Sequence, residues 1–203
     1  MRIVRVFISS PGDTENERKR AARVMERLNA AYSDTAQFKP VLWEERYYSA
    51  HESFQRQIER STDCDIVLAI LRGRLGTPLP PDFVARLPEK DRIPEPAAYQ
   101  SGTAYEILSA IAARRRGATL PDIFVFRYPR DPVVSLDDEK RAEIESQWQK
   151  LKQFAEQVFV TTEGHFKGAY QTFGSTDDFE TKVEGALRQW LSELLPVSTG
   201  HRR

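Results

Sequence analysis

One carboxylate stands out in the stretch Ser101-Gly-Thr-Ala-Tyr-Glu106, which is otherwise small, apolar or hydroxylated. The apolar residues here and just beyond follow the i, i+3, i+4, i+7 spacing of one helix face: Ala104, Ile107, Leu108 and Ile111. Glu106 lies off that face, in the first turn of the predicted helix. A lone carboxylate in such a place suits a ribose hydroxyl or a developing oxocarbenium ion, the charge that glycosidases stabilise.

The same residues also have a purely structural interpretation. Thr103 and Glu106 fit the capping box, in which the glutamate side chain bonds back to the backbone amide of the threonine. The sequence alone leaves both interpretations open.

Further polar residues follow three predicted strands. Because the carboxyl ends of parallel strands meet at one edge of a sheet, with a ligand crevice at the switch point, we expect these residues to share a pocket with Glu106. The predicted substrate-binding residues are Ser9, Ser10, Gly12, Asp13, Trp43, Arg72, Arg74 and Ser101. Backbone amides and arginines suit phosphates, and an aromatic ring suits a base or a nicotinamide. The set favours a nucleotide glycosidase.

These residues too have structural alternatives. The run from Ser9 to Asp13 could form only a turn, Arg72 and Arg74 could be solvated loop residues, and Trp43 could belong to the core. Thr14 and Glu17 form a second apparent capping box, which predicts the start of the next helix.

The elements that must position this site alternate between strand and helix. The strands are predicted at 3–8, 39–43, 65–71, 122–128 and 169–173, and the helices at 14–32, 54–61, 101–114, 137–160 and 179–194. Alternation of this kind predicts an α/β fold with a central five-stranded parallel sheet and right-handed crossovers. We expect a flavodoxin-like three-layer fold with strand order 2-1-3-4-5, forming a single domain over residues 1–195.

The segment 72–102 breaks the pattern, because it holds six prolines and little periodicity. Loops of this length inside a domain are usually functional or mobile, so we predict an insertion that closes over the site.

Composition narrows the function further. The 203 residues carry 30 basic and 30 acidic side chains, so no whole-chain field favours nucleic acid or a membrane. One cysteine and three histidines argue against a disulfide framework and a metal site. Without a signal peptide or a long apolar run, the predicted location is the cytoplasm. Residues 196–203 are predicted to be a linker or disordered tail that leads to a further domain. Phosphate-loop, dinucleotide-binding and nucleophile-elbow motifs are absent.

Several motifs together resemble a known family. They are Val6-Phe-Ile-Ser-Ser-Pro-Gly-Asp13, Glu17-Arg18, Asp63-Cys-Asp-Ile-Val67, Arg74-Leu-Gly-Thr-Pro78 and Ser101-Gly-Thr-Ala-Tyr-Glu106. They resemble a TIR-related domain found at the N-termini of bacterial STAND-type NTPases and of some eukaryotic NACHT and WD-repeat proteins. The resemblance covers about residues 3–130. This chain departs from the TIR pattern in its long segment before the glutamate helix, and in having Ala104 and Tyr105 where a tryptophan is usual.

The resemblance implies a flavodoxin-like fold and cleavage of NAD⁺ at the nicotinamide–ribose bond, with Glu106 as the catalytic glutamate. It also implies that the loop 44–51 serves oligomerisation and that a downstream sensor or NTPase region clusters the domain. We therefore expect a TIR-like effector that hydrolyses NAD⁺ in bacterial anti-phage immune signalling, with NAD⁺ as substrate and no cofactor. The alternatives are a non-catalytic self-association module, a nucleotide binder and a deoxyribosyltransferase-like domain.

Overall fold

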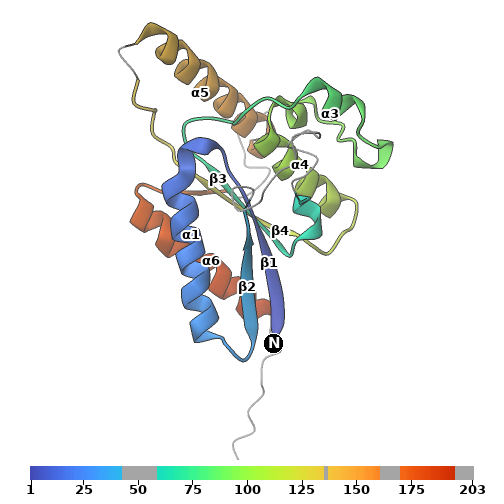
Figure 1. Ribbon diagram of the computed structural model, residues 1–203, viewed down its shortest axis with the longest axis vertical. Coiled ribbons are helices and arrows are strands. Elements are labelled where there is room, and N and C mark those ends of the chain that lie inside the picture. The colour runs from blue at the N-terminus through green and yellow to red at the C-terminus, as the bar shows by residue number, and fades with distance from the viewer. Residues whose placement is uncertain (43–58, 135–136, 161–169, 195–203) are drawn as a thin grey trace, which may run out of the picture.

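The computed structural model describes residues 1–42, 59–134, 137–160 and 170–194. Its centre is an all-parallel sheet of five strands in the order β2-β1-β3-β4-β5, which confirms the predicted fold class and strand order (Figure 1). The strands are β1 (Arg2–Ser9), β2 (Ala36–Val41), β3 (Ile66–Leu71), β4 (Asp122–Arg127) and β5 (Gln171–Thr172). The helices are α1 (Glu15–Ala31), α3 (Pro81–Ala85), α4 (Gly102–Arg115), α5 (Asp138–Phe159) and α6 (Thr176–Leu194).

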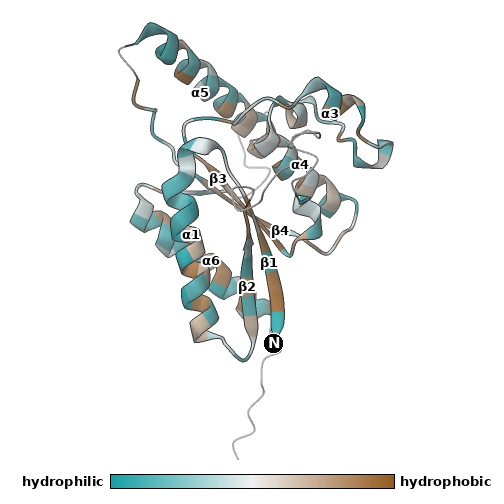
Figure 2. Cartoon of the chain, in the orientation of Figure 1, coloured by the Kyte–Doolittle hydropathy of each residue, from teal (hydrophilic) through white to brown (hydrophobic). Residues whose placement is uncertain are grey.

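Helices cover both faces of the sheet. On one face, α1 and α6 pack side by side and enclose a core that includes Phe38, Phe126 and Phe179. On the other face, α4 and α5 enclose a second core around Leu108 and Phe154. Figure 2 shows β3 and most of β1 and β4 as hydrophobic, while α1 and α5 are mostly hydrophilic. Every residue of β3 is buried, as expected for the middle strand of a covered parallel sheet.

The second strand lies earlier in the chain than predicted. It starts at Ala36 rather than at Lys39, and it pairs with β1 from Arg2 onward. Asn29 of α1 holds it there, since its side chain accepts from the Phe38 amide at 2.7 Å and donates to the Phe38 carbonyl at 2.9 Å. The pattern of apolar residues could not predict these two hydrogen bonds, because they come from a polar side chain on a helix.

The insertion 72–102 contains more regular structure than predicted. It holds α3 and two short 3₁₀ helices, η4 (Glu89–Asp91) and η5 (Pro96–Gln100). Two of its prolines start helices, Pro81 at the first position of α3 and Pro96 at the first position of η5, where a missing amide hydrogen costs nothing. Tyr99 holds residues 93–99 in a compact loop, because its hydroxyl accepts from the Ile93 amide and donates to the Ile93 carbonyl.

The remaining predicted elements either match the structure closely or lie outside the described residues. Helix α5 begins after Asp137, whose side chain caps it, and ends within one residue of its predicted end. The predicted helix at 54–61 lies mostly outside the described residues, and so do Trp43 and the loop 44–51. None of the helices in the described ranges is long and apolar enough to cross a lipid bilayer.

Gly76, near the start of the insertion, has a left-handed backbone conformation, φ +113°. A Cβ atom there would lie 3.0 Å from the Thr103 hydroxyl oxygen. We expect Gly76→Ala to lower the free energy of unfolding by about 1–3 kcal/mol, because strain and crowding act together. Urea unfolding measures this loss.

Gly117→Ala is the matched control for that substitution. Gly117 also has a positive φ, +94°, but its Cβ would meet no atom within 4 Å. We therefore expect Gly117→Ala to lower the free energy of unfolding less than Gly76→Ala does. Equal losses in the two variants would mean that the close approach to Thr103 contributes nothing.

Candidate functional site

Glu106 projects from α4 toward the carboxyl end of β1. Ser9, the last residue of β1, is fully buried, and its hydroxyl donates to Glu106 Oε2 at 2.8 Å. Glu106 itself is 8% exposed, so its carboxylate is largely shielded from water and still borders open space. The two residues are 97 positions apart in the chain, and the fold brings them together.

The capping-box interpretation of Glu106 is wrong. Helix α4 begins one turn before that glutamate, and its N-cap is Ser101. The Ser101 hydroxyl accepts from the Ala104 amide at 3.1 Å and donates to the Leu75 carbonyl at 2.8 Å. Thr103 therefore lies inside the helix, and the capping role belongs to Ser101, a predicted substrate-binding residue.

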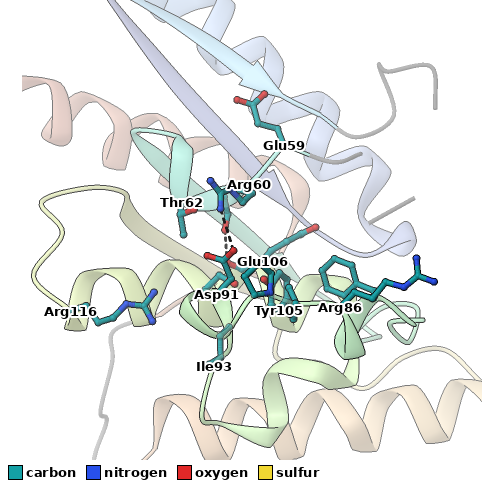
Figure 3. A pocket seen from close by; sticks show the side chains of 14 residues that line it. Glu59, Arg60, Thr62, Arg86, Asp91, Ile93, Tyr105, Glu106 and Arg116 are labelled. Carbon is teal, nitrogen blue, oxygen red and sulfur yellow. Dashed lines mark hydrogen bonds and ion pairs between the residues drawn. The ribbon is translucent and has the colours of Figure 1, made fainter. Parts of the chain in front are cut away.

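A cavity of about 350 Å³ adjoins Glu106. Its wall comes from α4, from residues 59–62 before β3 and from the insertion (Figure 3). The charged side chains of the lining are Glu59, Arg60, Arg86, Asp91, Glu106 and Arg116. Its apolar and aromatic side chains are Phe83, Leu87, Pro88, Ile93 and Tyr105. This volume and this mixture of apolar walls with a few charged groups are typical of small-molecule sites.

Contacts around the cavity hold its parts in place. The Ser61 hydroxyl donates to the Glu106 carbonyl at 2.8 Å, which attaches the segment before β3 to α4. Arg60 lies 3.6 Å from the Asp91 carboxylate, which attaches that segment to the insertion. The Phe83 and Tyr105 rings meet edge to face with centroids 5.3 Å apart, and burial raises the pKa of Tyr105.

The loop after β1 is held by a residue that sequence reasoning did not select for the site. Arg18, only 3% exposed, donates through Nη1 to Ser10 Oγ at 3.1 Å, to the Pro11 carbonyl at 2.9 Å and to Thr14 Oγ1 at 3.1 Å. The Ser10 hydroxyl therefore takes part in hydrogen bonding within the loop. The sequence did contain a signal for this role, since Arg18 lies on the apolar side of an amphipathic helix. A charge buried there needs several hydrogen-bond acceptors, which predicts a structural contact.

Comparison with known protein families shows which family the chain belongs to. Residues 5–188 match a family described as Domain of unknown function (DUF4062). The chain belongs to the DUF4062 family. No match was found among curated proteins. The matched range takes in Ser9, the insertion and Glu106, so the whole candidate site lies within the DUF4062 domain.

The predicted arginines of the DUF4062 chain point elsewhere. Arg72 forms an ion pair with Glu17 and lies over the Tyr128 ring at 4.7 Å. Arg74 lies 3.8 Å from the Glu143 carboxylate. Among the described residues, the cations that line the cavity beside Glu106 are Arg60, Arg86 and Arg116.

Glu17 is not the capping residue predicted for α1. Its side chain is fully buried and paired with Arg72, while the Thr14 hydroxyl donates to the Pro11 carbonyl at 2.8 Å. The capping pattern misled because a glutamate in the first turn of a helix can turn to the sheet instead of to its own helix end.

Asp13 and Gly12 complete the predicted set. The Asp13 carboxylate accepts from the Gly73 amide at 2.8 Å and so joins the loops after β1 and β3. Desolvation by these loops raises the Asp13 pKa, while the Gly73 hydrogen bond and the charges of Arg74 and Arg72 oppose that rise. Gly12 faces open space. Within the described ranges, no three His, Cys, Asp or Glu side chains gather as a metal site would require.

Proposed function

We propose that this DUF4062 domain is a TIR-like NAD⁺ glycohydrolase with Glu106 as its catalytic residue. The observation that carries the proposal is the Glu106 carboxylate, held by the Ser9 hydroxyl at 2.8 Å on the border of the 350 Å³ cavity. The motifs that resemble TIR-related domains add support from the sequence.

In this proposal, cleavage of the nicotinamide–ribose bond needs few protein groups besides the Glu106 carboxylate. Glu106 accepts hydrogen bonds from the ribose hydroxyls and stabilises the positive charge that develops at the anomeric carbon as the glycosidic bond breaks. Nicotinamide is cationic in NAD⁺ and leaves as a neutral molecule, so no general acid is needed. Water then adds to the anomeric carbon and loses a proton, which yields ADP-ribose. Ser9 acts as a positioning residue, since its hydrogen bond orients the carboxylate.

The cavity offers groups for the rest of the substrate. The ring pair of Phe83 and Tyr105 supplies an apolar wall suited to an aromatic base. Arg86 and Arg116 line the same cavity and suit the pyrophosphate, in place of the Arg72 and Arg74 assignment made from the sequence. In this proposal the insertion, which contributes Phe83 and Arg86, forms part of the substrate site.

Activation in this proposal comes from clustering by a downstream sensor, in bacterial anti-phage signalling. The test is NAD⁺ consumption by the chain free in solution and by the same chain clustered on a multivalent scaffold. We expect clustering to start NAD⁺ loss, with one nicotinamide released for each NAD⁺ consumed. A clustered chain that is folded and leaves NAD⁺ intact would refute the glycohydrolase and favour a non-catalytic self-association module.

A further inference from the structure

The cavity beside Glu106 has two cationic side chains without an acidic partner. Arg86 and Arg116 both line it, and neither side chain forms an ion pair or a hydrogen bond within the described part of the chain. The third arginine of the lining, Arg60, lies 3.6 Å from the Asp91 carboxylate. Two guanidinium groups in this cavity are therefore available to an anionic ligand.

The other carboxylates of the lining do not neutralise these two cations. Glu59 is paired with Arg5 of β1. Glu106 accepts a hydrogen bond from the Ser9 hydroxyl at 2.8 Å. A guanidinium presents several N–H donors in a fixed fork that matches the oxygens of a phosphate group. Each of the two unpaired arginines thus suits one phosphate group of a ligand.

The two arginines lie far apart, on opposite sides of Glu106 (Figure 3). Arg86 ends α3 one turn after Phe83, whose ring meets that of Tyr105, the residue before Glu106. Arg116 is the C-cap of α4, ten residues beyond Glu106, which corresponds to about 15 Å along the axis of an α-helix. Either arginine alone suits a pyrophosphate, but a substrate with two separated phosphate groups would use both at once.

We propose that the preferred substrate of this site is the 2′-phosphorylated dinucleotide NADP⁺, and that Arg116 selects it. The inference rests on the proposed function, since Glu106 fixes where the nicotinamide ribose lies. In NADP⁺ the pyrophosphate follows that ribose, and the 2′-phosphate lies farther away, on the adenosine ribose. Arg86 then binds the pyrophosphate, and the remote Arg116 binds the 2′-phosphate.

The reaction is the one already described, with a different product. The bond between nicotinamide and ribose breaks, and nicotinamide leaves with the bonding electron pair as a neutral molecule. Water adds to the anomeric carbon and loses a proton to the solvent. The products are nicotinamide and the 2′-phosphate of ADP-ribose.

The first test compares the cleavage of NADP⁺ and NAD⁺ by the clustered chain. We expect kcat/KM for NADP⁺ to exceed that for NAD⁺ about tenfold, the effect of one hydrogen-bonded charge pair. Arg116→Met should bring the ratio of the two values close to one, because the 2′-phosphate loses its counter-ion. Arg116→Lys keeps the charge without the fork and should restore part of the preference.

Arg115→Met is the matched control for this test. Arg115 precedes Arg116 in α4, but it donates to Glu95 at 2.7 Å and is not part of the described lining of the cavity beside Glu106. This variant should keep the wild-type ratio. A wild-type ratio in Arg116→Met would overturn the inference, and would leave Arg116 only its favourable place as a cation at a helix C-terminus.

A binding measurement separates this inference from the proposed chemistry. Adenosine 2′,5′-bisphosphate and 5′-AMP differ only in the 2′-phosphate, and calorimetric titration of the clustered chain compares them. We expect the bisphosphate to bind about tenfold more tightly, and Arg116→Met to remove the difference. Equal cleavage of NADP⁺ and NAD⁺ would overturn the inference and leave the glycohydrolase standing. Selective binding without cleavage of either dinucleotide would support the Arg116 contact and refute the glycohydrolase.

Discussion

Glu106→Gln is expected to lower the rate of NAD⁺ cleavage by the clustered domain about 10²–10³-fold, the range found when one preorganised electrostatic group is removed from an active site. Glutamine has nearly the same shape, and its amide oxygen can still accept from the Ser9 hydroxyl. It lacks the negative charge that stabilises the developing cation. Nicotinamide release at saturating NAD⁺ measures the rate, and thermal unfolding checks that the fold is retained.

Glu59→Gln is the matched control for this prediction. Glu59 also lines the cavity, but it pairs with Arg5 of β1 and has no part in the proposed mechanism. Its rate should stay close to that of the wild type. If Glu106→Gln cleaved NAD⁺ at the wild-type rate, Glu106 would be removed from the mechanism even though the activity remained.

Arg72→Met is expected to lower the free energy of unfolding by about 3 kcal/mol, because it leaves a buried carboxylate without its counter-ion. Only 1% of the Glu17 side chain is exposed, and its Oε2 has no hydrogen-bond partner in the described part of the chain. Methionine keeps much of the apolar volume beside Tyr128, so the loss reports mainly on charge. Urea unfolding at neutral pH measures it.

A double-mutant cycle isolates that interaction. Arg72→Met should have a much smaller effect in a Glu17→Gln background, because the uncompensated charge is no longer present. Equal effects in the two backgrounds would mean that the ion pair contributes nothing specific. The KM for NAD⁺ of a folded Arg72→Met variant should match the wild type, since Arg72 does not line the described cavity beside Glu106. A raised KM would return Arg72 to the substrate site.

The architecture of this chain is encoded largely in local patterns. β-branched runs predicted the central strands, and the 3.6-residue spacing of apolar side chains predicted α4, α5 and α6. Alternation of strand and helix then left few topologies, because crossovers are right-handed, and the observed strand order is the predicted one. The same patterns set Glu106 apart, because a charged residue in a short apolar helix start is conspicuous.

Partnerships between distant side chains were decided only by the tertiary structure. Both predicted capping boxes failed, for two reasons. Helix α4 begins one turn earlier than the Thr103–Glu106 pattern indicated. Glu17 does lie in the first turn of α1, but a first-turn glutamate looks alike in sequence whether it caps its helix or turns inward. Glu106 turned to Ser9, and Glu17 turned to Arg72. The cavity beside Glu106 likewise takes Arg86 from the insertion, whose path no local period determines. Hydrophobic periodicity records which face of an element is buried, whereas the partner of a buried charge depends on how loops far apart in the chain meet above the sheet.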